Sequence, residues 1–264
     1  MGRLWHIGRK PIVIAHRGGG NEEAENSLTA FANMAAKGFR YIETDSHATQ
    51  DGVVILFHDP TLDRTTNGSG SISDHTADQI AAVRDASGNS PVRLRDALEQ
   101  FPSVVFNIDA KSVQVVAHLA RTIEDAGATA RVSLSSFSEK RLKVLRRLLP
   151  GVRSSIGTSG IATLVFASIL PAALGATVAR AVPGADQGVE AVQVPIADHG
   201  IRVVTPRFVR LCHKLGYAVH VWTINDQTTM HRLLAMGVDG LVTDEPSLAQ
   251  RVIDKYWAAR AHFA

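Results

Sequence analysis

Short runs of apolar, β-branched residues alternate along the chain with longer segments in which apolar residues recur every three or four positions. The first pattern is typical of buried strands, and the second of amphipathic helices that pack on a sheet. The pattern predicts strands over residues 12–15, 41–45, 104–109, 132–135, 153–156, 191–194, 218–222 and 240–243. It predicts helices over residues 27–37, 113–126, 139–149, 207–215, 230–236 and 248–259.

Eight strands that alternate with helices over about 250 residues are typical of a (β/α)8 TIM barrel. A doubly wound open sheet shows the same alternation and is the competing architecture, but the chain has no glycine-rich dinucleotide fingerprint. Residues 60–102 interrupt the alternation with a turn-rich segment at 65–70 and one helix near 93–100. We therefore predict one barrel domain over residues 1–264, with a small insertion at about 60–102 after the second strand.

The segment 154–178 contains no charged residue, and a run of that length can span a bilayer. Gly157, Gly160, Pro171 and Gly175 interrupt the run, which lies between predicted strands of the barrel. We therefore expect a buried or partly exposed apolar helix, through which the protein makes at most weak contact with a membrane or lipid.

Composition and charge narrow the classes of function. The chain has 28 Lys and Arg against 25 Asp and Glu in 264 residues, a net charge of +3 with no basic block, so nucleic acid is not a predicted partner. The single cysteine, Cys212, excludes an internal disulfide and a metal site built from several cysteines. No export signal precedes the first strand, which predicts a cytoplasmic protein.

Polar residues gather where the predicted strands end, which is the functional face of a barrel. Glu43 and Asp45 lie two residues apart on one strand and therefore face the same side, and Asp109 can join them from the next strand. Clustered carboxylates repel one another unless a cation lies between them. Their oxygen atoms suit Mg²⁺ or Ca²⁺ and not zinc. The alternative is a network of salt bridges with Arg17 and Lys111 that holds no metal.

Two histidines lie near these carboxylates in the predicted barrel. His16 follows the first strand, and His58 follows the apolar run 53–57. Histidine titrates near neutrality, as general acid–base catalysis requires. Arg17 and Lys111 supply fixed positive charge for phosphate oxygens. Together these groups predict a site for hydrolysis of a phosphodiester.

Three further residues at strand ends have two interpretations each. Trp222 either packs in the core or forms an apolar wall for the substrate, and Phe137 has the same ambiguity. Asp244 either caps the helix that follows it or contacts substrate. The pattern assigns no role to His47.

Several short motifs occur in a fixed order along the chain. They are His16-Arg17-Gly18, Glu25-Asn26-Ser27, Glu43-x-Asp45, Thr49-Gln50-Asp51-Gly52, the run from His58 to Gly68, Asn107-Ile108-Asp109-Ala110-Lys111, Ser136-Phe137, Trp222-Thr223-Ile224-Asn225 and the run from Gly237 to Pro246. No single one of them is specific. Their order resembles the glycerophosphodiester phosphodiesterase family from about residue 12 to residue 250.

The resemblance implies a barrel with a small insertion and a phosphoric diester hydrolase that needs a divalent cation, Mg²⁺ or Ca²⁺. The implied reaction converts a small-molecule glycerophosphodiester to an alcohol and sn-glycerol 3-phosphate. The positions that match the family's site are the metal ligands Glu43, Asp45 and Asp109, the catalytic His16 and His58, and the phosphate contacts Arg17 and Lys111. Trp222 is the remaining candidate for substrate binding. The family pattern has Glu at the position of Asp109, and proline where this chain has Ala24.

Two other functions are compatible with the sequence. The first is a lysophospholipase D of the same fold that uses residues 154–178 to contact an acyl chain at a membrane surface. The second is a catalytically silent barrel that acts as a binding module. The silent barrel is disfavoured because both histidines and all three carboxylates are present.

Overall fold

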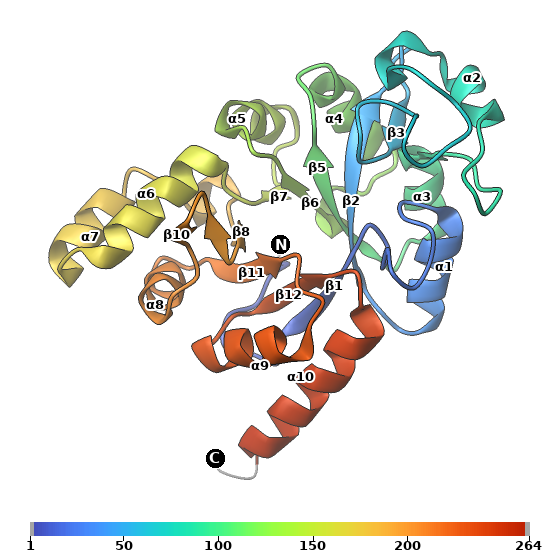
Figure 1. The fold of residues 1–264 in the computed structure, drawn as a ribbon. Coiled ribbons are helices and arrows are strands. Elements are labelled where there is room, and N and C mark those ends of the chain that lie inside the picture. The colour runs from blue at the N-terminus through green and yellow to red at the C-terminus, as the bar shows by residue number, and fades with distance from the viewer. Residues whose placement is uncertain (1–2, 262–264) are drawn as a thin grey trace.

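The computed structural model describes residues 3–261 and has a nearly closed barrel of eight parallel strands (Figure 1). The barrel strands are β1 (Ile12–His16), β2 (Tyr41–Ala48), β5 (Val105–Ala110), β6 (Val132–Ser135), β7 (Arg153–Ser154), β8 (Ala191–Pro195), β11 (Ala218–Trp222) and β12 (Gly240–Thr243). Their order is β7-β6-β5-β2-β1-β12-β11-β8. A parallel bridge between Ser154 and Val189 brings β7 close to the start of β8. The (β/α)8 TIM barrel is confirmed, and the open doubly wound sheet is wrong.

Helices follow the strands and cover the outside of the barrel (Figure 1). They are α1 (Leu28–Ala36), α3 (Leu94–Gln100), α4 (Val115–Asp125), α5 (Glu139–Leu148), α6 (Thr158–Ile169), α7 (Ala172–Ala179), α8 (Pro206–Lys214), α9 (Gln227–Met236) and α10 (Pro246–Ala261). Most of them bury an apolar stripe in the core around the strands, whereas α7 packs on α6. In α4, Val115, Leu119 and Ile123 are fully buried at helical spacing. The outer core therefore lies between the sheet and the helices.

An antiparallel extension lies between β2 and α3. It contains β3 (Val54–Leu56), the 3₁₀ helix η1 (Ile72–Asp74), α2 (Ala77–Ala82) and β4 (Val92–Arg93). β3 pairs with the end of β2, with Ser46 opposite Leu56. Ile55, Leu62 and Ile80 are buried in a small core of its own. The extension therefore stands on the carboxyl end of β2, beside the mouth of the barrel.

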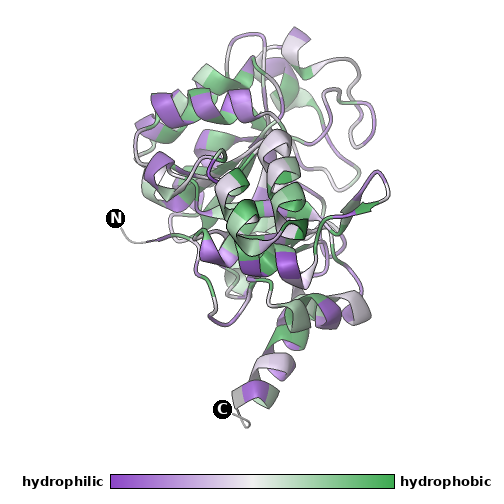
Figure 2. Cartoon of the chain, turned by 90° about the vertical axis from the view of Figure 1, so that its left-hand side faces the viewer, coloured by the Kyte–Doolittle hydropathy of each residue, from purple (hydrophilic) through white to green (hydrophobic). Residues whose placement is uncertain are grey.

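The uncharged segment 154–178 forms two helices. α6 ends before Leu170, and Pro171 is the N-cap of α7. No helix among residues 3–261 is long and apolar enough to cross a bilayer. Leu164 and Ala167 face the barrel and are buried, whereas Phe166 and Ile169 are exposed. α6 and α7 lie on the side of the molecule that faces the viewer in Figure 2. The expectation of a partly exposed apolar helix holds for α6.

Three smaller elements complete the described chain. They are the 3₁₀ helices η2 (Thr129–Arg131) and η3 (Ala185–Gln187) and the hairpin of β9 (Ala197–Asp198) and β10 (Ile201–Arg202).

The segment before β1 closes the amino-terminal end of the barrel. Trp5 is fully buried, and its ring centroid lies 5.3 Å from that of Tyr41 and 4.7 Å from that of His220. Its indole nitrogen donates to Ser133 Oγ at 3.1 Å. The backbone nitrogens of Leu4 and Trp5 donate to Glu190 Oε2. The periodicity of the sequence does not predict this plug, because the segment forms neither a strand nor a helix.

Candidate active site

A glycine-rich turn after β1 positions the first two candidate residues. Arg17 has a φ of +51° and Gly18 a φ of +83°, and Gly18 N donates to Ala15 O at 3.2 Å. A Cβ on Gly18 would lie 2.9 Å from the Cβ of Ala30 in α1. Only glycine fits both the positive φ and this close approach. The turn therefore packs on α1 while His16 and Arg17 stay at the carboxyl end of β1.

Three carboxylates lie together at the carboxyl ends of β2 and β5. Glu43 and Asp45 share one side of β2, and the strand register places Asp45 opposite Asp109 on β5. All three residues are buried. Lys111 Nζ lies 2.7 Å from Asp45 Oδ1 and 3.0 Å from Asp109 Oδ2. The structure therefore brings together the three carboxylates and the lysine that the sequence singles out.

The electrostatics of this cluster reflect burial and like charge. Burial and the charge of Asp45 raise the pKa of Glu43 above its usual range. Burial alone would lower the pKa of Lys111, but the charges of Asp109 and Asp45 outweigh burial and raise it. Two cationic side chains, Lys111 and Arg17, thus contact a cluster of three carboxylates.

The carboxylate oxygens of the cluster are of the type that binds a divalent cation. Among residues 3–261, no group of three or more His, Cys, Asp or Glu side chains has the arrangement of a metal site as it stands, and Lys111 bridges Asp45 and Asp109. However, the buried Oδ1 of Asp109 has no hydrogen-bond partner in the described chain. Burial and the neighbouring charge of Asp45 raise the pKa of Glu43, and a cation bound there would offset the like charge. Carboxylate oxygens suit Mg²⁺ or Ca²⁺.

One ring nitrogen of His16 is hydrogen-bonded to Asp244, and the other faces the carboxylate cluster. Nδ1 donates to Asp244 Oδ1 at 2.6 Å, and Nε2 lies 3.8 Å from Glu43 Oε2. Burial alone would lower the pKa of His16, but the hydrogen bond to Asp244 and the charge of Glu43 outweigh burial and raise it. Asn225 Nδ2 donates to the other oxygen of Asp244 at 2.8 Å. Asp244 therefore fixes the tautomer in which Nε2 is free to accept a proton.

His58 repeats this arrangement on the antiparallel extension. Its Nδ1 donates to Asp59 Oδ1 at 2.6 Å, and the other oxygen of Asp59 accepts from Arg64 Nε. Burial alone would raise the pKa of Asp59, but its hydrogen bonds with Arg64 and His58 outweigh burial and lower it. An ionised Asp59 can only accept, so Nε2 of His58 is again the free nitrogen. Both candidate histidines are therefore oriented by an aspartate.

A chain of ion pairs joins the two histidine sites. Arg64 Nη2 donates to Glu25 Oε1 at 2.5 Å, and Arg17 Nη1 donates to Glu25 Oε2 at 3.1 Å. Arg17 Nε lies 3.4 Å from Asp45 Oδ2. This chain connects Asp59, beside His58, to the carboxylate cluster. The salt bridges with Arg17 and Lys111 that the metal-free alternative expects are therefore present. They leave Oδ1 of Asp109 without a hydrogen-bond partner in the described chain.

Two aromatic rings meet at another part of the rim. Trp222 ends β11 and Phe137 follows β6, and the two rings lie edge to face with centroids 6.1 Å apart. Phe137 is 61% exposed. The contact with an exposed ring places Trp222 at the rim, where an apolar wall for a substrate is possible.

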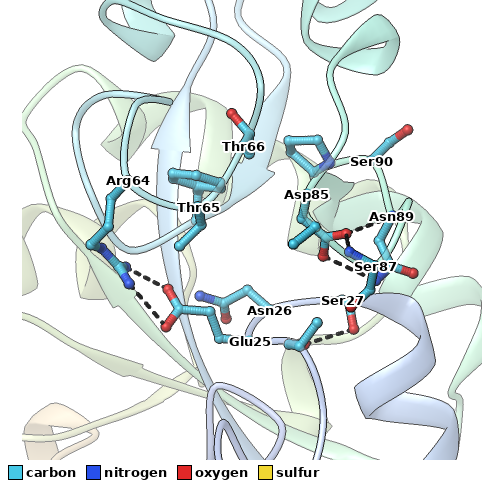
Figure 3. Close-up of a pocket in the computed structure, with 14 residues that line it drawn as sticks. Glu25, Asn26, Ser27, Arg64, Thr65, Thr66, Asp85, Ser87, Asn89 and Ser90 are labelled. Carbon is cyan, nitrogen blue, oxygen red and sulfur yellow. Dashed lines mark hydrogen bonds and ion pairs between the residues drawn. The ribbon is translucent and has the colours of Figure 1, made fainter.

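A cavity of about 270 Å³ lies between α1 and the antiparallel extension (Figure 3). Glu25, Asn26 and Arg64 line one side of it, and Asp85 and Asn89 line the other. Glu25 binds Arg17, and Asn26 Nδ2 donates to Asp45 Oδ2 at 3.4 Å. Asn26 therefore borders both the cavity and the carboxylate cluster, and Glu25 is linked to the cluster through Arg17.

Comparisons with known proteins match this arrangement to one family. Residues 16–248 match the model of the glycerophosphoryl diester phosphodiesterase family. A probable glycerophosphodiester phosphodiesterase 2 of Mycobacterium tuberculosis is 36% identical over 252 residues, which cover 95% of this chain and 92% of the relative. The chain belongs to the glycerophosphoryl diester phosphodiesterase family. It is therefore an enzyme of the phosphoric diester hydrolase class.

A further relative and a solved structure agree with this assignment in sequence and in fold, respectively. The glycerophosphodiester phosphodiesterase of Caldanaerobacter subterraneus is 28% identical and covers 93% of this chain and 99% of its own. A phosphodiesterase of Oleispira antarctica, solved in complex with the product sn-glycerol-3-phosphate, superposes with a TM-score of 0.76 at 22% identity, covering 92% of this chain and 97% of its own. At that identity the superposition shows the shared fold.

Sequence reasoning missed or left open four residues that contact the candidate site. Asp244 and Asp59 orient the histidines, and Glu25 links the two arginines. His47 is buried beside the site, and its Nε2 donates to the backbone oxygen of His58 at 3.1 Å. The available signal was spacing: His47 follows Glu43 and Asp45 at intervals of two, so it shares their side of β2.

Proposed function

We propose that the enzyme hydrolyses glycerophosphodiesters to an alcohol and sn-glycerol 3-phosphate, with His16 and His58 as its acid–base pair and with a divalent cation at Glu43, Asp45 and Asp109. The observation that carries the proposal is the position of His16. Its Nδ1 is tied to Asp244 and its Nε2 faces the carboxylate cluster. We also propose that residues 1–264 act as one barrel domain.

His16 is the proposed general base, and His58 the general acid. Nε2 of His16 takes a proton from water as the water oxygen forms a bond to phosphorus. The bond from phosphorus to the alcohol oxygen breaks, and protonated His58 gives its proton to that oxygen. Asp244 and Asp59 keep each ring in the tautomer that the transfer needs.

The charged residues have a second role in the proposal. Arg17 and Lys111 offer N–H donors to phosphate oxygens. A cation held by the three carboxylates would neutralise part of the phosphate charge when bound. The unpartnered Oδ1 of Asp109 and the raised pKa of Glu43 support this ligand set.

The reaction is tested by turnover of glycerophosphocholine after chelation, with Mg²⁺ and Ca²⁺ added back separately. We expect activity to vanish on chelation and return with one of the cations. His16→Ala and His58→Ala should each lower kcat by about 10²-fold or more, while His199→Ala, whose side chain is 92% exposed, should not. Full activity in excess chelator, with no metal retained by elemental analysis, would remove the cation from the proposal.

The ligand set is tested separately by calorimetry of Mg²⁺ and Ca²⁺ binding. Asp109→Ala should weaken binding sharply because three carboxylates become two. Asp109→Glu should retain binding because the family pattern places Glu there. If Asp109→Ala binds the cation as well as the native chain, Asp109 is not a ligand.

One observation favours lysophospholipids as a second substrate class. The exposed ring of Phe137 beside Trp222 gives the rim an apolar surface that an acyl chain could contact. Lysophosphatidylcholine, assayed beside glycerophosphocholine, tests this lysophospholipase D activity. Release of choline from the lysolipid, lost in Phe137→Ser and retained for glycerophosphocholine, is the expected result if this class is used.

A further inference from the structure

The exposed large hydrophobic side chains of this protein gather in one part of the chain. Among the described residues, all of them except Val113 lie between positions 137 and 201. They are Phe137, Val144, Leu148, Phe166, Ile169, Leu174 and Ile201. Scattered apolar residues need no explanation, but a concentration on consecutive elements indicates an interaction surface.

The centre of this surface is formed by α6 and α7. Phe166 and Ile169 are 54% and 65% exposed on the outer side of α6, and Leu174 of α7 is 52% exposed. No residue from 154 to 178 carries a charge. The two helices project from the side of the barrel, with their pale and green residues toward the viewer in Figure 2. The centre is therefore apolar and uncharged over two helices.

Cationic stripes border this centre on both sides, because α6 packs against both α5 and α8. The exposed cations recur at helical spacing in each neighbour. They are Lys140, Lys143 and Arg147 on α5 and Arg207, Arg210 and Lys214 on α8. None of the six has an ion-pair partner within residues 3–260.

Acidic residues do not balance these stripes. α8 contains no Asp or Glu. The only acidic residue of α5, Glu139, accepts from Arg146 and from the backbone nitrogen of Gly157. The stripes therefore leave six unneutralised positive charges beside an apolar centre.

We propose that this face, made of the outer sides of α5, α6, α7 and α8, binds the surface of an anionic phospholipid bilayer. Phe166, Ile169 and Leu174 would enter the boundary between head groups and acyl chains. The lysines and arginines on either side would contact lipid phosphates. The apolar centre and the cationic stripes thus both match an anionic bilayer.

A second copy of the chain fits this face less well. A symmetric dimer places the same patch on both sides of the interface. The cationic stripes of the two copies would then oppose each other, and juxtaposed like charges disfavour association. A bilayer that supplies negative charge has no such cost.

The face is continuous with the rim of the active site. The backbone nitrogen of Thr158, the first residue of α6, donates to Phe137 O at 3.0 Å. Phe137 in turn contacts Trp222. A bilayer on this face would therefore lie next to the barrel mouth without covering His16, which is on the far strand β1.

Vesicle flotation tests the proposal, with the native chain at low and high salt. The vesicles contain equal amounts of phosphatidylglycerol and phosphatidylcholine, or phosphatidylcholine alone. We expect binding to the anionic vesicles at low salt, weaker binding at high salt, and little binding to the neutral ones. No binding to anionic vesicles at low salt overturns the proposal.

Matched variants separate this face from net charge. The triple variant Arg207→Gln, Arg210→Gln, Lys214→Gln should lose about tenfold or more in vesicle affinity. The control variant Arg121→Gln, Arg251→Gln, Lys255→Gln removes the same charge from exposed positions of α4 and α10 and should bind as the native chain does. Equal loss in both variants means that binding follows net charge alone and overturns the proposal.

The apolar centre is tested by the double variant Phe166→Ser, Ile169→Ser, with sedimentation analysis beside flotation. Reduced vesicle binding by a chain of unchanged oligomeric state supports the proposal. Unchanged vesicle binding, together with conversion of a dimer to a monomer, shows an interface between copies and overturns it. Hydrolysis of glycerophosphocholine without vesicles should be the same in all these variants, so failure of the proposed reaction is visible separately.

Discussion

At the scale of single residues, the orientation of His16 depends on one carboxylate from the other end of the chain. Asp244 accepts from Nδ1 and is itself held by Asn225 through its second oxygen. Burial alone would raise the pKa of Asp244, but these hydrogen bonds outweigh burial and lower it. Asp244 is therefore ionised at neutral pH and acts on the reaction through His16.

We expect Asp244→Asn to lower kcat by about 10²-fold while KM changes little, because the amide no longer enforces the tautomer that leaves Nε2 free. Steady-state kinetics on glycerophosphocholine measure both constants. Asp198→Asn, at an exposed hairpin position, is the matched control. A native kcat in Asp244→Asn would mean that the orientation of His16 does not depend on this charge.

The buried His220 of β11 contributes to the pH dependence of stability. Burial lowers the pKa of His220 from 6.5 to about 4. Between these values the unfolded chain binds a proton that the folded chain does not, so the free energy of unfolding rises with pH. This contribution is complete above pH 6.5 and falls by about 3 kcal/mol as the pH is lowered toward 4.

His220→Gln should make the free energy of unfolding less dependent on pH between about 4 and 6.5. The slope of that free energy against pH should fall by the equivalent of about one bound proton. Urea unfolding at several pH values measures the slope. His199→Gln, at an exposed position, should leave the slope as it is in the native chain. An unaltered slope in His220→Gln would assign the acid sensitivity to other groups.

Spacing along the sequence was enough to group Glu43, Asp45 and Asp109, because residues two apart on a strand share a side and neighbouring strands share an edge. It was not enough for Asp244. Capping a helix and contacting the site are both compatible with its place after β12. Its partner His16 lies 228 positions earlier, and no local pattern reports a pairing at that separation.

At the scale of elements, several short buried strands were predicted closely. β6, β11 and β12 have the expected bounds. β2 extends three residues beyond its predicted end because its last residues pair with β3. The pairing of β2 with β3 depends on contacts between the two strands, which the periodicity of the sequence does not predict. The same holds for the break between α6 and α7.

The start of α6 is tightly packed against α5. Gly157 is the N-cap of α6, and a Cβ there would lie 2.4 Å from the backbone nitrogen of Glu139. Its φ of −75° is open to any residue, so a substitution acts through this clash alone. Gly157→Ala should therefore lower the free energy of unfolding by about 2 kcal/mol.

Chemical denaturation measures this loss, and Gly127→Ala is an informative control. Gly127 has a φ of +59° but open space around its Cα, so its replacement should cost only about 1 kcal/mol, through backbone conformation. A Gly157→Ala variant as stable as the native chain would show that α5 and α6 can separate at no cost.

At the scale of the whole molecule, the two ends of the barrel have different roles. The carboxyl ends of the strands carry the polar site, and the amino ends are closed by the segment before β1. Trp5 contributes most to this closure, because its ring is fully buried against Tyr41 and His220.

Trp5→Ala should lower the free energy of unfolding by about 3–5 kcal/mol, through lost burial and the cavity left behind. Thermal and urea unfolding measure the loss. Trp257→Ala, at a partly exposed position of α10, should cost clearly less. An equal loss of unfolding free energy in the two variants would show that the buried position of Trp5 adds nothing to the effect of removing a tryptophan side chain.

The pairing of β1 with β12 affects the protein while it is being synthesised. Ile12 lies opposite Gly240, and Ala15 opposite Thr243, so the partner of β1 is synthesised more than 200 residues after β1 itself. Until then one edge of β1 has unpaired backbone N–H and C=O groups that another chain could bind. A ribosome that stalls before residue 240 would release an open sheet in which this edge of β1 has no partner strand. Truncated products of this gene should therefore aggregate or be degraded, instead of persisting as partial barrels.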